Sequence, residues 1–166
     1  TWKIRIMIPQ QIKMLADQYA LVKASRTILL KYCSNISTDH FYTSQSSFGR
    51  GSIHNLLAHI SNTYNFWIGE QFLGKTTEYI SYTDTTPFNS FNSVFQNIDL
   101  LMQSFFDNLE SQPPEAFYYE IDGKNGQSTS LEVFTHVITH EYHHKGQLLS
   151  LSRELGYTPV DTDILR

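Results

Sequence analysis

Apolar residues recur at steps of three and four in four long segments of this 166-residue chain, and stretches rich in Ser, Thr, Asn, Gly and Pro separate them. That spacing places the apolar side chains on one face of an α-helix. No alternating run is long enough to build a sheet, so each apolar face must be covered by the other helices. The pattern therefore predicts an all-α four-helix bundle that forms a single domain over residues 1–166.

The first two helices are marked by their apolar faces and their end signals. The first follows Pro9 and extends to about Cys33, and Arg26 is the one charge that interrupts its apolar face. We expect this arginine to extend its charged end to solvent, the alternative being an ion pair with an acid near a functional site. Ser52 predicts the N-cap of the second helix, which we expect to end near Gly74.

Proline marks both ends of the third helix. Thr86 followed by Pro87 has the order of a cap and a first helical residue, and Pro113-Pro114 ends the helix. The stretch Asn35–Gly51, between the first two helices, is polar and is expected to form a loop.

A short hairpin and a capped helix are expected in the last third of the chain. Residues Ala116–Ile121 alternate loosely and lead into Asp122-Gly123, a dipeptide that favours a tight hairpin turn. Thr129 and Glu132 have the spacing of a capping box for the fourth helix. That helix should end at Gly156.

Charge and composition exclude several classes of partner. Lysine and arginine number 12 against 16 acidic residues, a net charge of −4, so the chain lacks the basic surface that nucleic acid requires. No apolar run approaches the roughly 18 residues of a membrane span, and the start Thr1–Arg5 does not resemble a signal peptide. The single cysteine, Cys33, favours a reducing compartment. We therefore expect a cytoplasmic protein without nucleic-acid or membrane partners.

Four of the seven histidines fall within the fourth helix. On a helical wheel His144 points almost straight at the apolar face, His140 lies roughly 50° away, and His136 and His143 lie about 90° and 110° away. His140 and His144 are separated by one turn, so both rings can bind a single ion. This spacing permits a metal site without requiring one.

Two ligands hold an ion weakly, so a third donor is needed from another helix. His59, in the middle of an apolar run of the second helix, is the candidate. The alternative is that each histidine is a core residue satisfied by a hydrogen bond. Several unpartnered buried imidazoles are costly, whereas a shared divalent ion converts that cost into binding energy. Both interpretations remain open on spacing alone.

Two motifs make the chain resemble the DinB/YfiT-like metalloproteins over nearly its whole length. They are the run Gly51-Ser-Ile-His-Asn-Leu-Leu-Ala-His-Ile60 with Trp67 eight residues after His59, and the run His140-Glu-Tyr-His-His-Lys-Gly-Gln147. The resemblance implies a four-helix bundle with a long connection and a divalent ion held by His59, His140 and His144. The family motif usually has arginine where this chain has Lys145, and lysine lacks the guanidinium fork.

The resemblance also implies an activity. Characterised relatives include thiol transferases that use bacillithiol or mycothiol and a thiol-dependent maleylpyruvate isomerase. Three neutral imidazoles leave a position open on the ion, as in catalytic sites, and zinc or nickel is the expected metal. We therefore expect a thiol S-transferase that takes a low-molecular-weight thiol and a small electrophile. The alternatives are a metal-dependent hydrolase and a non-catalytic metal-binding stress-response module, and exposed aromatic residues favour a homodimer.

Overall fold

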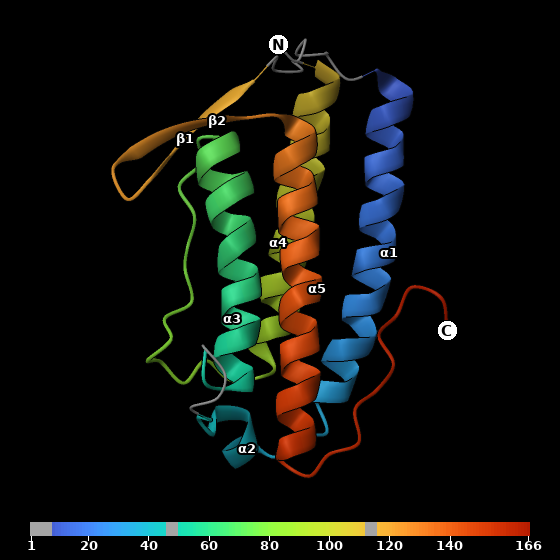
Figure 1. The fold of residues 1–166 in the computed structure, drawn as a ribbon, viewed down its shortest axis with the longest axis vertical. Coiled ribbons are helices and arrows are strands. Elements are labelled where there is room, and N and C mark those ends of the chain that lie inside the picture. The colour runs from blue at the N-terminus through green and yellow to red at the C-terminus, as the bar shows by residue number, and fades with distance from the viewer. Residues whose placement is uncertain (1–7, 46–49, 112–115) are drawn as a thin grey trace.

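Four long helices pack side by side in the computed structural model, which describes residues 8–45, 50–111 and 116–166 (Figure 1). Their apolar faces meet in a core rich in phenylalanine, where the rings of Phe105 and Phe134 stack 6.4 Å apart. None of the helices in the described ranges has the length and apolarity needed to cross a membrane. The predicted all-α bundle is confirmed, and its long helices are α1 (Pro9–Cys33), α3 (Ile53–Tyr64), α4 (Ser90–Ser111) and α5 (Ser130–Glu154).

The second predicted helix changes pitch half-way along. Ser52 caps α3 as expected, accepting a hydrogen bond from the Asn55 backbone, but the segment η1 (Asn65–Phe72) continues as a π-helix. The helical path ends at Gly74, whose φ of 62° favours glycine, so the predicted end is confirmed. The periodicity of the sequence did not reveal the wider turn, which is a feature often found at functional sites.

A long connection, residues 73–89, returns along the outside of α3 before α4 begins (Figure 1). The side chain of Asn62 holds it in place: its amide donates to the Ile80 carbonyl and its oxygen accepts from the Ile80 backbone, both at 2.9 Å. Asn65 donates to the Glu78 carbonyl at 2.7 Å. These bonds fix the connection beside the part of α3 that carries His59.

Two details of the predicted helices were wrong. The stretch expected to be a loop contains a short helix, α2 (Thr38–Tyr42), which Ser37 caps through the His40 backbone. Five residues are too few to show a helical period, so the sequence pattern could not reveal it. The third long helix begins at Ser90, after the Thr86–Pro87 signal, because residues 87–89 form a turn first. Its predicted stop, Pro113-Pro114, lies outside the described residues.

The hairpin and the capped helix are confirmed. Strands β1 (Phe117–Ile121) and β2 (Lys124–Ser128) pair antiparallel around Asp122 and Gly123, whose φ angles of 51° and 72° suit a tight hairpin turn. The capping box of Thr129 and Glu132 starts α5. This orients α5, the helix that carries four histidines.

Candidate metal centre

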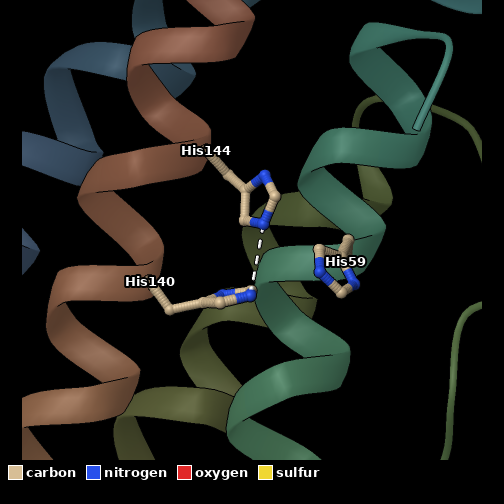
Figure 2. Close-up of side chains that lie close together, drawn as sticks. All are labelled: His59, His140 and His144. Atoms are coloured by element: carbon tan, nitrogen blue, oxygen red, sulfur yellow. Dashed lines mark hydrogen bonds between the residues drawn. The ribbon is translucent and has the colours of Figure 1, made fainter. Parts of the chain in front are cut away.

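Three histidine rings from two helices converge at one edge of the bundle (Figure 2). His140 and His144 lie one turn apart on α5, and His59 faces them from α3. One ring nitrogen from each lies within 4.8 Å of the other two, and the Nε2 atoms of His140 and His144 are 3.2 Å apart. The structure thus brings together all three histidines singled out in the sequence.

The rings differ in burial as the helical wheel predicted. His144 is buried, at 7% exposed, and His140 is half-buried, whereas His136 and His143 are exposed. His59 is half-buried on α3. The cluster therefore lies at the boundary between the core and the surface, where an ion can exchange with solvent.

Hydrogen bonds fix the tautomer of His144. Its Nδ1 lies 2.7 Å from Oε1 of Gln147, and because an amide oxygen only accepts, Nδ1 carries the proton. The lone pair of Nε2 then faces His140. The amide nitrogen of Gln147 donates in turn to Nε2 of His143 at 3.1 Å. Gln147 thus orients the ring in the form that a metal ligand requires.

His59 is oriented in the same way by two different groups. Nη2 of Arg50 lies 3.3 Å from its Nε2, and a guanidinium only donates, so Nε2 carries the lone pair. The Nδ1 proton then points to the hydroxyl of Tyr82 at 3.0 Å. An ion on Nε2 would take the place of the Arg50 hydrogen bond, while the bond to Tyr82 could stay.

All three imidazoles are held neutral. Burial lowers the pKa of His59 to about 3, with help from the positive charge of Arg50 and from the other two rings. Burial and then His144 lower the pKa of His140 to about 4. Burial also lowers the pKa of His144, more than the Gln147 bond raises it. Near pH 7 each ring is therefore in its metal-binding form.

The residues present fit a divalent ion. Two nitrogens that each bind a tetrahedral ion at about 2.0–2.1 Å lie about 3.3–3.4 Å apart, close to the 3.2 Å between the Nε2 atoms of His140 and His144. The free lone pairs of His144 and His59 are both on Nε2, which is the arrangement that lets two helices share one ion. Imidazole donors suit zinc, nickel, cobalt or iron.

Comparison with known proteins agrees with this geometry. The profile of the DinB family matches residues 11–166. The chain belongs to the DinB family. No curated protein sequence matches it. DinB-like proteins bind metals, and the three-histidine group of this member could hold an ion.

Two charged residues of α5 in this DinB protein, Glu141 and Lys145, are buried in the core beside the histidines and pair with each other. Glu141 is buried and accepts from both nitrogens of Arg26 that face it, at 2.8 and 3.0 Å, and from Nζ of Lys145 at 3.0 Å. The hydroxyl of Tyr64 donates to it at 2.7 Å. Burial raises the pKa of Glu141, but Arg26 and Lys145 outweigh burial and lower it to about 2.

The expectation that Arg26 reaches solvent was therefore wrong. Its side chain is only 3% exposed and also pairs with Asp99 of α4 at 2.9 Å. The partner is an acid beside the site, which is the alternative that the sequence left open. Arg26 and Glu141 are 115 residues apart in the chain, so no local pattern could connect them.

Three polar residues near these histidines in the sequence, Glu141, Asn55 and Thr63, do not hydrogen-bond to their rings. Glu141 is engaged in the core, Asn55 binds His54, and Thr63 donates to the backbone carbonyl of His59. Gln147, three residues after His144, could have been found from helical spacing. Tyr82 could not, because it reaches His59 from the long connection.

The other histidines have separate surroundings. His54 is buried edge-on against the ring of Phe41, 5.8 Å away, in agreement with a core role. His40, expected in a loop, lies in α2. His136 packs against Trp67 with ring centres 5.0 Å apart and does not belong to the three-nitrogen cluster.

A cavity of about 770 Å³ opens beside the cluster. His59, His140 and His136 line one side of it. The long connection, η1 and residues Asn62 and Thr63 of α3 form the rest, so the cavity exists because residues 73–89 fold back along α3. Four aromatic side chains contribute to its wall: Phe66, Trp67, Tyr79 and Tyr82.

Proposed function

We propose that this DinB protein is a thiol S-transferase that depends on a divalent ion, zinc or nickel, bound by His59, His140 and His144. The observation that carries the proposal is the convergence of three neutral imidazoles beside an open cavity. When bound to three neutral ligands, the ion keeps its positive charge and favours the thiolate form of a low-molecular-weight thiol such as bacillithiol or mycothiol. In the net reaction the sulfur forms a bond to an electrophilic carbon, the leaving group departs with its electron pair, and the thiol proton goes to solvent.

The protein's own residues prepare the site for this chemistry. Gln147 and Tyr82 hold the rings of His144 and His59 with Nε2 free. Burial keeps the rings unprotonated, and the cavity gives a small electrophile access to the same edge. The proposal includes a cytoplasmic location, where small thiols are kept reduced, and a homodimeric state.

The surroundings of the cluster favour transfer to a thiol over hydrolysis. Among the described residues, no Asp or Glu lines the cavity, and the pKa values of the three histidines are shifted only by burial, by Gln147, by Arg50 and by other histidines. A hydrolase needs a base to remove a proton from water, and with no carboxylate in the wall this role would fall to an imidazole such as that of His136. A thiol has a pKa near 8.5 and ionises far more readily, so it needs no such base.

A two-stage experiment tests the proposal. Elemental analysis of the untagged protein should find about one divalent ion per chain, and the metal-loaded protein should conjugate bacillithiol or mycothiol to members of a panel of alkyl and aryl electrophiles. His144→Ala should lose both properties, and His40→Ala, on α2 and outside the cluster, should keep them. Hydrolysis of esters or amides without conjugation of a thiol would show that the protein is a hydrolase and not a transferase. Bound metal that neither azide nor thiols can reach would indicate a non-catalytic module.

A further inference from the structure

The cavity beside the three histidines has a wall that suits flat apolar molecules. Trp67 is central to it: its ring meets those of Phe66 and His136 edge-on, at centre distances of 5.3 and 5.0 Å. Such edge-on packing holds the rings in fixed positions. Aromatic surfaces held in this way attract other aromatic rings without the entropic cost of ordering flexible side chains.

Most polar groups of the wall are already used inside the protein. Both ends of the Asn62 amide bind the Ile80 backbone, and the Thr63 hydroxyl binds the His59 carbonyl. The Tyr82 hydroxyl binds His59 as well. A ligand therefore gains little from hydrogen bonding to these residues, because each new bond would replace an existing one.

Charge is also missing from the wall. No Lys, Arg, Asp or Glu of the described ranges lines the cavity. The closest cation is Arg50, and its guanidinium is engaged with Nε2 of His59 and lies 5.2 Å from the centre of the Tyr82 ring. In the metal-free protein, a carboxylate or ammonium entering the cavity would lose its hydration without gaining a charged partner from the wall.

Two histidines of the wall keep unused polar atoms: Nδ1 of His140 is buried without a hydrogen-bond partner among the described residues, and His136 is exposed. The ring of His136 is exposed on the cavity side of α5 and makes no side-chain hydrogen bond within the described part of the chain. The ring centre lies 5.6 Å from that of His140. A polar substituent bound to His136 would thus lie beside the three-histidine cluster.

We propose that this cavity binds a neutral, flat aromatic molecule, with its rings against Trp67 and Phe66 and its one polar group, a carbonyl or hydroxyl, hydrogen-bonded to His136. The inference rests on the proposed function, for which it names the class of the electrophilic substrate. A volume of about 770 Å³ lies within the range of small-molecule sites and accommodates a fused two-ring system.

Binding to the metal-free protein tests this inference without relying on catalysis. The probe is 2-acetonaphthone, a neutral ketone whose absorption overlaps tryptophan emission, so its binding quenches Trp67. Trp2, the other tryptophan, is changed to Phe in every variant to remove its signal. Two compounds of similar shape serve as comparisons: 2-ethylnaphthalene lacks the carbonyl, and 2-naphthoate carries a charge.

We expect the ketone to bind about 5–10-fold more tightly than the hydrocarbon, which is the usual effect of one hydrogen bond. It should bind at least about tenfold more tightly than the carboxylate, because the carboxylate loses hydration. His136→Phe should abolish the advantage of the ketone while the hydrocarbon still binds. His143→Phe, a matched change on the same helix outside the cavity, should leave all three affinities unchanged.

Trp67→Ala removes the fluorescent reporter, so calorimetry measures binding to this variant. Trp67→Ala should weaken all three probes, and circular dichroism checks that the helices remain. Tighter binding of 2-naphthoate, or a Trp67→Ala protein that binds all probes as before, would overturn the inference. Because no metal or thiol is present, failure of the transferase activity would not affect these measurements, and failure of these measurements would not affect metal binding.

Discussion

Neighbouring residues of α5 belong to two polar clusters of opposite character. His140 and His144 face His59 of α3, whereas Glu141 and Lys145, one position later in each case, face the core. One residue rotates a helical position by about 100°, so adjacent side chains reach different surroundings. The inner cluster, with Arg26, is charged and closed, whereas the outer cluster is neutral, and its His140 and His144 rings share a hydrogen bond between their Nε2 atoms.

The two clusters have different tasks: the charged inner cluster stabilises the packing of the helices, and the three-histidine outer cluster is available for binding. Glu141 receives hydrogen bonds from Arg26 of α1, Lys145 of α5 and Tyr64 of α3, so both its oxygens are fully used. Tyr64 is five residues after His59 on α3, and Glu141 follows His140 on α5. The closed cluster therefore ties together the two helices whose relative rotation sets the geometry of the open one.

The largest effect on stability is expected from a substitution that breaks the closed cluster, which is the inner cluster of Glu141, Arg26 and Lys145. Glu141→Gln leaves the buried Lys145 without a carboxylate partner and Arg26 with Asp99 alone, which should lower the free energy of unfolding by about 3–5 kcal/mol. Urea unfolding of the metal-free protein measures it. The control is Asp17→Asn, which breaks the exposed Lys13–Asp17 pair and should change stability by less than about 0.5 kcal/mol. Equal effects from the two changes would contradict a special role for the inner cluster.

The second prediction concerns the open cluster. Zinc at 100 times its dissociation constant should raise the free energy of unfolding by about 2.7 kcal/mol, because the folded chain alone presents the three nitrogens together. His140→Ala should remove this stabilisation while the stability of the metal-free protein changes little. Thermal unfolding with and without zinc provides the measurement. His40→Ala, on α2 and outside the cluster, is the matched control, and loss of the zinc effect there would show that the ligands were wrongly assigned.

A third prediction tests how the open cluster is oriented. Gln147→Leu removes the acceptor for the Nδ1 proton of His144 and should weaken metal binding about 10–100-fold. Gln147→Glu keeps an acceptor oxygen and should restore most of the affinity. Competition with a chromophoric chelator measures both variants. If the leucine variant bound metal like the wild type, the amide would have no part in holding the ring.

The smallest expected effect lies outside both clusters, at the start of α5. The backbone of Thr129 and the hydroxyls of Ser128 and Thr129 donate to Glu132 and lower its pKa. Because the folded-state pKa is below the unfolded value, the carboxylate stabilises the fold above about pH 4.3 and ceases to do so as the pH falls through the folded-state pKa. Glu132→Gln should cost about 0.5–1 kcal/mol at pH 7, and this difference from the wild type should shrink in acid. Urea unfolding at pH 7 and in acid measures this difference in the free energy of unfolding. A difference that stayed constant would exclude the carboxylate charge as the cause of the stabilisation.

Local patterns were enough for most of the helical architecture. The limits of α1, the caps of α3 and α5 and the turn of the hairpin depend on residues close together in the chain, and these were predicted correctly. The short α2 and the delayed start of α4 were missed because each depends on one turn of backbone hydrogen bonds, which leaves no periodic pattern. The π-helical pitch of η1 was missed for the same reason.

The sequence by itself determined that four amphipathic helices must cover one another and that His140 and His144 share a face, since both follow from the helical period. Only the tertiary structure decided that His59 faces them, that Tyr82 orients His59 from the long connection, and that Arg26 enters the core to meet Glu141. Partners so far apart in the chain are chosen by packing and by the need to satisfy buried polar groups, and neither leaves a local signal.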